Sequence, residues 1–132
     1  MSAGGRIAYV VLRGTLGVIF VTHGAARLYH RSVGDFGAFL DGSGLPAGFV
    51  LAWIITIGEM VSGSLLAAGV AVRYAAVFHA VVIASGIVMV HLPQGWFTVG
   101  HGSGGMEYSV LILAVLGYVF TRKDQPSLLR RP

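Results

Sequence analysis

Six polar side chains stand in or beside apolar stretches of this sequence, and their types suit ligand binding or proton transfer. The clearest is Glu59, the one charged residue in the apolar run from Leu51 to Val72. A charge near the centre of a bilayer costs at least about 2.5 kcal/mol on insertion scales, so such a residue faces protein and has a partner. We therefore expect Glu59 to point inward. The candidate ligand and proton site residues are Arg13, His23, Arg27, Glu59, His91 and Glu107.

The first apolar stretch offers Glu59 a basic partner. Helix rise places Arg13 roughly 10 Å from the cytoplasmic end of that stretch, and its long side chain can cover much of the distance to Glu59. We predict an Arg13–Glu59 ion pair. Two interpretations of the pair stay open: it fixes the register of two helices, or it lines a polar pocket for a ligand head group or a proton. The stripe that faces the carboxylate holds Arg13, Gly17, Phe20, Gly24 and Arg27.

Metal and haem chemistry find little support in the pattern. His23, His91, His101 and Glu107 are suitable ligand types for zinc, iron or copper, but no short spacing such as His-x3-His brings two histidines together. Glu107 has a simpler interpretation, because a carboxylate at the start of a helix is favoured by the helix dipole. The chain has no cysteine, which excludes disulfides, thiolate metal sites and thiol redox chemistry. We predict no metal site, and no catalytic residue can be named.

Composition places these residues in a membrane protein. The 132 residues fit a single domain. They are 55% hydrophobic and 11% charged, with a mean hydropathy of +0.80, whereas soluble domains carry roughly a quarter charged residues. The apolar runs are continuous, which favours helices over a barrel, and each is close to the roughly 20 residues of a membrane span. We predict an all-α, four-transmembrane-helix bundle in one domain, with spans at about 7–26, 48–72, 74–92 and 106–120.

The basic residues indicate topology and argue against nucleic-acid binding. Six fall at the N-terminus, in the second connection and in the tail, whereas only Arg27 and Arg31 fall on the opposite side. The positive-inside bias therefore places both termini in the cytoplasm of a multi-pass inner-membrane protein. Arg13 interrupts the first run, so we expect a retained span and not a cleaved signal peptide. The six residues are Arg6, Arg73, Arg122, Lys123, Arg130 and Arg131.

The connections carry weaker signals. In the first outer loop, Phe36, Phe39 and Leu40 have the spacing of one helix face, which predicts a short helix at the membrane interface. The second outer loop contains five glycines from Gly95 to Gly105, and these give it the freedom to fold closely or to move. The tail, residues 121–132, is basic and forms a cationic surface.

Four segments occur in a recognisable order: LRGTLGVIFVTHGAARL, GLPAGFVLAWIITIGEMVSGSLLAAGVAVRYAA, VHLPQGWF and GGMEYSVLILAVL. Together they resemble the DoxX family of small bacterial and archaeal membrane proteins over nearly the whole chain. The positions that match the family pattern are Arg13, Gly17, His23, Gly24, Arg27, Leu28, Gly44 to Pro46, Glu59, Arg73, His91 and Glu107.

The resemblance implies a four-helix membrane protein with a role in membrane-associated redox chemistry. Relatives in the family include a subunit of a thiosulfate:quinone oxidoreductase and a member of a complex with superoxide dismutase and a sulfurtransferase. The first hypothesis is thus an oxidoreductase subunit that holds a quinone in an apolar slot. Arg13 or His23 would donate to a quinone carbonyl, and Glu59 would accept or relay a proton. The electrons would come from a bound cofactor or from another subunit.

Two alternatives use the same residues differently. A non-enzymatic anchor would recruit soluble redox enzymes to the cytoplasmic side through Arg73 and the basic tail, and would need Arg13 and Glu59 only as structure. A small-molecule or proton carrier would use the buried polar groups as its path. One short bundle would then have to form a homo-oligomer through its small-residue faces.

Overall fold

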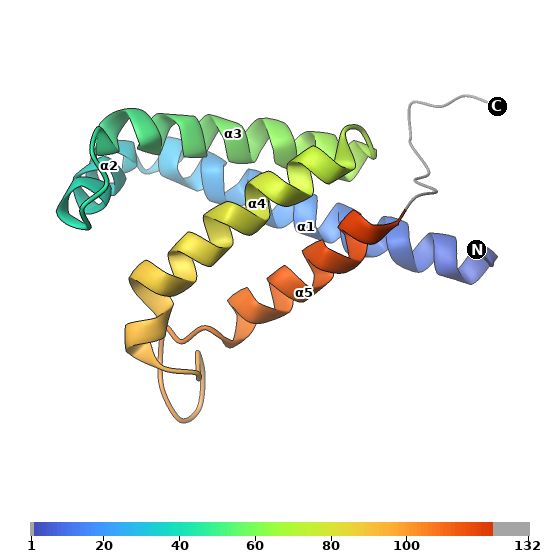
Figure 1. Cartoon of the computed structure of the whole chain (residues 1–132). Coiled ribbons are helices and arrows are strands. Elements are labelled where there is room, and N and C mark those ends of the chain that lie inside the picture. The colour runs from blue at the N-terminus through green and yellow to red at the C-terminus, as the bar shows by residue number, and fades with distance from the viewer. Residues whose placement is uncertain (1, 123–132) are drawn as a thin grey trace. The chain divides into compact units, whose positions relative to one another are not determined.

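The computed structural model describes residues 2–122, and every regular element in that range is a helix (Figure 1). The predicted all-α class is therefore confirmed. The described chain falls into two compact units, 2–70 and 71–122. A single membrane domain stays a prediction. The predicted basic tail, apart from Thr121 and Arg122, lies outside the described residues.

The first unit contains two long apolar helices and one short helix. α1 (Ala3–Tyr29) begins after Ser2, whose hydroxyl oxygen accepts a hydrogen bond from the N–H of Gly5. α3 (Gly48–Ala68) ends at Gly69, whose positive φ lets the chain turn away earlier than the predicted end of the span. At about 1.5 Å per residue the two helices are about 40 and 31 Å long, enough to cross a hydrocarbon core.

The side chains of α3 are arranged inside out compared with a helix of a soluble protein. Its buried face is built from small and polar residues, and its outer face carries large apolar ones. This pattern suits a helix whose outer face meets lipid, where association depends on close packing and internal polar contacts. The buried face comprises Gly48, Ala52, Thr56, Glu59, Gly63 and Leu66, and the exposed large residues include Phe49, Val50, Trp53, Ile54, Ile57 and Val61.

Glycines bring the backbones of α1 and α3 into close contact. A Cβ at Gly17 would lie 2.6 Å from the carbonyl oxygen of Gly63 and 2.7 Å from the Cβ of Ala67. A Cβ at Gly24 would lie 2.7 Å from the carbonyl oxygen of Thr56. Later positions of α1 thus face earlier positions of α3, so the two helices run antiparallel. We call this contact the glycine seam, and it fixes which levels of the two helices face each other.

The predicted short helix of the first outer loop is confirmed as α2 (Val33–Gly42). It packs against the start of α3, because Gly37 and Gly48 allow the two backbones to touch. Oδ1 of Asp41 accepts a hydrogen bond of 2.8 Å from the N–H of Gly48. Asp41 therefore satisfies one of the unpaired N–H groups at the N-terminus of α3. Its position at the membrane interface stays a prediction.

In the second unit, α4 (Val72–Gly86) changes its winding before it ends. It continues as a π-helical turn, η1 (Ile87–His91), and a 3₁₀ turn, η2 (Leu92–Gln94). Pro93 lies in the 3₁₀ turn and has no N–H to donate to the carbonyl four residues earlier, so the α-helical bonding pattern cannot continue through it. The N–H of Leu92 instead bonds to the carbonyl of Ile87, five residues back.

The glycine-rich loop that follows is closed at its base before α5 (Glu107–Thr121) begins. Backbone hydrogen bonds join Gly95 to Met106, Trp96 to Glu107 and Phe97 to Gly105. The loop therefore folds on itself as a compact unit instead of remaining open. At 15 residues, α5 is about 22 Å long, shorter than a typical hydrocarbon core.

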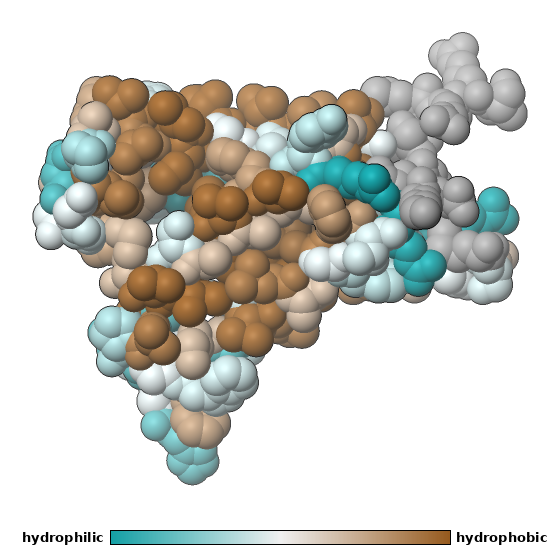
Figure 2. All heavy atoms as spheres, viewed as in Figure 1, coloured by the Kyte–Doolittle hydropathy of each residue, from teal (hydrophilic) through white to brown (hydrophobic). Residues whose placement is uncertain are grey.

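The described surface fits a membrane environment. Large apolar side chains cover much of the visible face (Figure 2). Helix hydroxyl groups bond to their own backbone instead of requiring water: Thr22 to Val18 and Ile19, Ser64 to Met60, and Ser85 to Val81. Three helical segments, Ala3–Tyr29, Gly48–Ala68 and Val72–Gln94, are long and apolar enough to span a membrane. The fourth span and the side of each terminus stay predictions.

The glycine seam predicts a size limit at Gly17. Replacing Gly17→Leu places a side chain against the backbone of Gly63 and should lower the free energy of unfolding by at least about 1–3 kcal/mol, as overpacking does. Thermal unfolding of purified protein in detergent, followed by circular dichroism, measures the effect. Gly14→Leu is the matched control, because a Cβ there meets no atom within 4 Å. Equal loss in both variants would show that the seam is not size-limited.

The chain has no cysteine, so single serine-to-cysteine variants can report topology. With four spans, an impermeant maleimide should label Ser43→Cys and Ser103→Cys in intact cells. It should reach Ser2→Cys and Ser127→Cys only after the membrane is permeabilised. Labelling of Ser127→Cys in intact cells, with the other three as expected, would show that the chain crosses the membrane three times and that α5 does not span.

Candidate functional site: a buried ion pair beside an open depression

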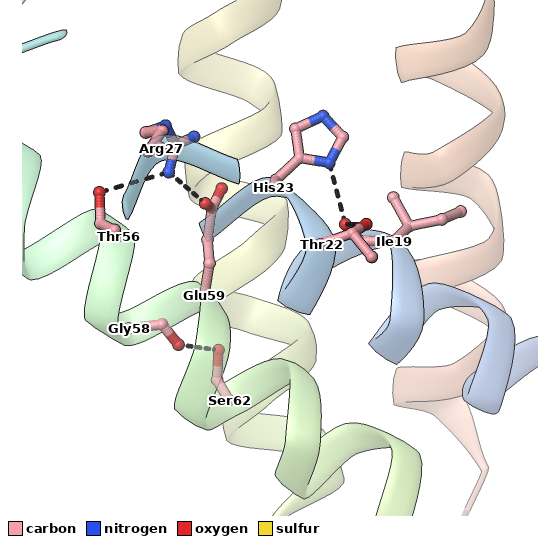
Figure 3. A network of polar contacts seen from close by, with 8 residues as sticks. All are labelled: Ile19, Thr22, His23, Arg27, Thr56, Gly58, Glu59 and Ser62. Atoms are coloured by element: carbon pink, nitrogen blue, oxygen red, sulfur yellow. Dashed lines mark hydrogen bonds and ion pairs between the residues drawn. The ribbon is translucent and has the colours of Figure 1, made fainter. Parts of the chain in front are cut away.

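A buried ion pair joins α1 to α3. Nη1 of Arg27 lies 2.5 Å from Oε2 of Glu59 and 3.5 Å from Oγ1 of Thr56 (Figure 3). The side chain of Glu59 is 4% exposed and that of Arg27 is 19% exposed. Glu59 thus points inward and has a basic partner, as the sequence predicts. The short charge-assisted bond compensates the cost of burying the carboxylate.

The predicted Arg13–Glu59 pair is wrong, and the lean of helical side chains explains the error. Side chains on a helix point toward its N-terminus. Because α1 and α3 are antiparallel, the side chains of Arg27 and Glu59 lean toward each other, whereas those of Arg13 and Glu59 lean apart. Arg13 is fully buried, and its Nη2 donates a hydrogen bond of 3.2 Å to the carbonyl of Ala67 near the end of α3.

The short helix α2 completes the surroundings of the Arg27 guanidinium. The ring of Phe36 lies with its centroid 4.6 Å from Cζ of Arg27, within the range of a cation–π contact. The guanidinium of Arg27, a residue of α1, is therefore held by groups from α2 and α3. Sequence reasoning assigned Phe36 to the membrane-facing side of α2. The contact of Thr56 with Arg27 depends on the register of α1 against α3, which the sequence pattern does not define.

An open depression of about 450 Å³ lies beside the ion pair. Both hydrogen bonds of the Arg27 side chain within residues 2–122 use Nη1. The N–H groups on Nε and Nη2 therefore stay available to a ligand. His30 also borders the depression and follows His23 and Arg27 at helical spacing, a signal that could have added it to the candidate residues. The depression is lined by Thr22, His23, Ala26, Arg27, His30 and Ser32.

His23 has one ring nitrogen engaged and the other available. Its Nδ1 lies 2.9 Å from the carbonyl oxygen of Ile19, one turn earlier on α1 (Figure 3). A carbonyl only accepts, so Nδ1 carries the proton in the neutral ring, and Nε2 is then an acceptor. The predicted site residue His23 thus offers a hydrogen-bond acceptor at a depression where Arg27 offers donors.

The two remaining candidates, His91 and Glu107, belong to the second unit and hold its loop. Nδ1 of His91 donates a hydrogen bond of 2.7 Å to the carbonyl of Gly104. Oε1 of Glu107 accepts one of 2.8 Å from the N–H of Thr98. Glu107 is at the start of α5, as the dipole interpretation expects, and it also closes the loop. The sequence does not indicate this role of Thr98, because its partner Glu107 lies at the other end of the glycine-rich loop.

The described residues contain no group of three or more His, Asp or Glu side chains placed to hold a metal ion. The polar groups instead occur as a pair with neighbouring hydrogen-bond donors and acceptors. Such groups can bind an uncharged polar head group or exchange a proton with it.

Apolar helices with an ionic interior define a helical membrane protein. The family model DoxX matches residues 8–92, more than half of the 132 residues, so the chain belongs to the DoxX family. The match begins within α1, includes α2, α3, α4 and the ion pair, and ends just after the π-helical turn. No curated protein and no solved structure matches the chain.

Neutralising either side chain of the ion pair should lower the stability of the protein, but by different amounts. Arg27→Gln leaves the buried carboxylate of Glu59 without its cation and should cost about 3–5 kcal/mol. Glu59→Gln should cost less, because Arg27 is partly exposed and keeps its contact with Phe36. The double variant should be more stable than Arg27→Gln alone. Thermal unfolding in detergent tests all three.

Arg31→Gln is the matched control for this cycle, because Arg31 is an exposed arginine close to the same end of α1. It should leave stability unchanged. Additive losses in the double variant would show that the two side chains do not stabilise each other.

Proposed function

We propose that this membrane protein binds a quinone-like ligand in the depression beside Arg27 and takes part in membrane-associated redox chemistry. One observation carries the proposal: the Arg27 guanidinium is shared between the buried carboxylate of Glu59 and an open depression that His23 also lines. The site therefore combines donors and an acceptor at a place that a membrane-dissolved molecule can reach.

The charge balance of the site supports an uncharged head group. Glu59 neutralises Arg27, so the pair has no net charge to offer to an anion. The remaining N–H groups of Arg27 are still strong donors that suit a carbonyl oxygen. A quinone has such carbonyls and little other polarity. A phosphate would instead favour a cation that is not already paired.

The residues present fit both oxidation states of such a ligand. Bound quinone supplies reversible uptake of two electrons and two protons, which converts it to quinol. Arg27 donates to a carbonyl oxygen of the oxidised form. His23 Nε2 accepts from a hydroxyl of the reduced form and can take its proton. The electrons are exchanged with a partner redox protein.

The role of Glu59 in this proposal is to position Arg27. Its carboxylate fixes Nη1, so the other guanidinium nitrogens have a defined direction. Thr56 and Phe36 restrict the same group from two further sides. A donor held in advance binds with less loss of side-chain entropy than a free arginine.

The competing interpretation, a non-enzymatic anchor for soluble redox enzymes, needs no ligand at Arg27. It rests on Arg73 and the basic tail, most of which lies outside the described residues. A ligand-binding measurement separates the two, because an anchor binds no quinone with these residues.

The proposal predicts that His23 contributes to affinity without supporting the fold. His23→Ala should weaken binding of a short-chain quinol about tenfold, the value of one hydrogen bond of about 1.4 kcal/mol. Calorimetric titration of detergent-purified protein, kept reduced, measures it. Mass spectrometry of the purified sample shows which quinone is retained.

His101→Ala is the matched control, because His101 is an exposed histidine in the glycine-rich loop of the second unit. It should bind as the natural chain does. If the natural chain binds no quinone or quinol, the proposal fails and the anchor is favoured. If both histidine variants lose the same affinity, His23 is not a ligand contact.

A further inference from the structure

An apolar groove of about 420 Å³ runs between α1 and α3 on the first unit. Its walls are mostly small residues, including Gly17 and Ala67 of the glycine seam, which leave a hollow where larger side chains would make a ridge. They include Gly17, Val21, Thr22, Ser64, Ala67 and Ala68.

The groove and the polar depression meet at Thr22, which lines both. Val18 borders the groove, and Ala26 and His30 border the depression. Val18, Thr22 and Ala26 on α1 and His30 at its C-cap follow one another at intervals of four, so each lies next to the following one on the helix surface. The two hollows are therefore arranged end to end, with the polar one toward the C-terminal end of α1.

The hydroxyl groups in the groove have no hydrogen to donate to a ligand, because each donates its hydrogen within its own helix. Oγ1 of Thr22 donates to carbonyls of its own helix, and Oγ of Ser64 donates to the carbonyl of Met60 at 2.7 Å. The remaining wall residues have apolar side chains or none. The groove thus suits a flexible hydrocarbon chain that fills it by close packing.

We infer that the groove holds the apolar tail of the ligand whose head group binds beside Arg27. This inference rests on the proposed function and narrows the ligand to a long-chain amphiphile of the isoprenoid quinone class. The head lies among Arg27 and His23, the chain passes Thr22, and the tail lies along α1 and α3 against Ala67 and Ala68. Bulk lipid can cover any apolar face, but here an apolar hollow continues into a polar one that Arg27 lines.

The test is photolabelling with a quinone that carries a diazirine on its isoprenoid tail. Purified protein in mild detergent is irradiated with this probe, and the labelled peptides are located by mass spectrometry. Labels should concentrate on residues 17–22 and 64–68. Ala68→Phe fills the groove and should remove most of that labelling, while binding of a tailless quinone by calorimetry stays unchanged.

Two further variants provide a second groove substitution and a control. Ser64→Phe fills the same groove from an exposed position of α3, in case Ala68→Phe does not fold. Ala84→Phe is the matched control, because Ala84 is exposed on α4 and lines neither hollow. It should label as the natural chain does, since detergent dissolves the probe equally in all samples.

The outcomes separate the inference from the proposed function. The tail site is overturned if the labels spread over other apolar faces, or if neither groove variant changes them. The head-group site still stands in that case, provided that the tailless quinone binds. If the tailless quinone does not bind to the natural chain, both the proposed function and the tail site are overturned. Groove labels that both phenylalanine variants remove, with intact tailless binding, support both.

Discussion

The close contact of α1 and α3 at the glycine seam determines how the charged groups of Arg27 and Glu59 meet in the first unit. Gly17 lies against Gly63 and Gly24 against Thr56, and these close contacts define the register in which the two helices meet. That register places Arg27 one turn beyond the level of Glu59, where the lean of both side chains brings them together. A helix pair held apart by larger residues would leave the same charges out of reach. The glycine seam thus allows the two charges to pair, and this pairing offsets the cost of burying the carboxylate of Glu59.

Packing and charge act together in this unit, although neither follows the pattern of a soluble protein. The hydrophobic effect does not drive α1 onto α3, because lipid tails are as apolar as the outer faces of the helices. Close backbone approach and one internal ion pair take its place. The same small residues that permit the approach also leave a groove on the surface. The glycine seam and the groove in which we propose that the ligand tail lies therefore share Gly17 and Ala67.

The helical class, the inward direction of Glu59 and the buried stripe of α1 follow from periodicity and from the cost of a charge in hydrocarbon. The partner of Glu59 does not follow, because Arg13 and Arg27 share one stripe and only the register chooses between them. Phe36 could not be placed beside Arg27 either, since its position depends on how α2 docks against α3. Loop contacts such as that of Glu107 with Thr98 depend on backbone turns that composition leaves undefined.

The order of the two charges along the chain has a consequence for biogenesis. Arg27 lies two residues from the end of α1, so its long side chain can reach toward the membrane surface when α1 enters the bilayer alone. Glu59 lies near the middle of α3 and has no such escape. Synthesis delivers the arginine first, and the membrane then already contains a counter-ion when the carboxylate arrives. The arginine of α1 thus facilitates the insertion of α3. In a chain with these two helices in the opposite order, the carboxylate would have to enter the membrane before its counter-ion.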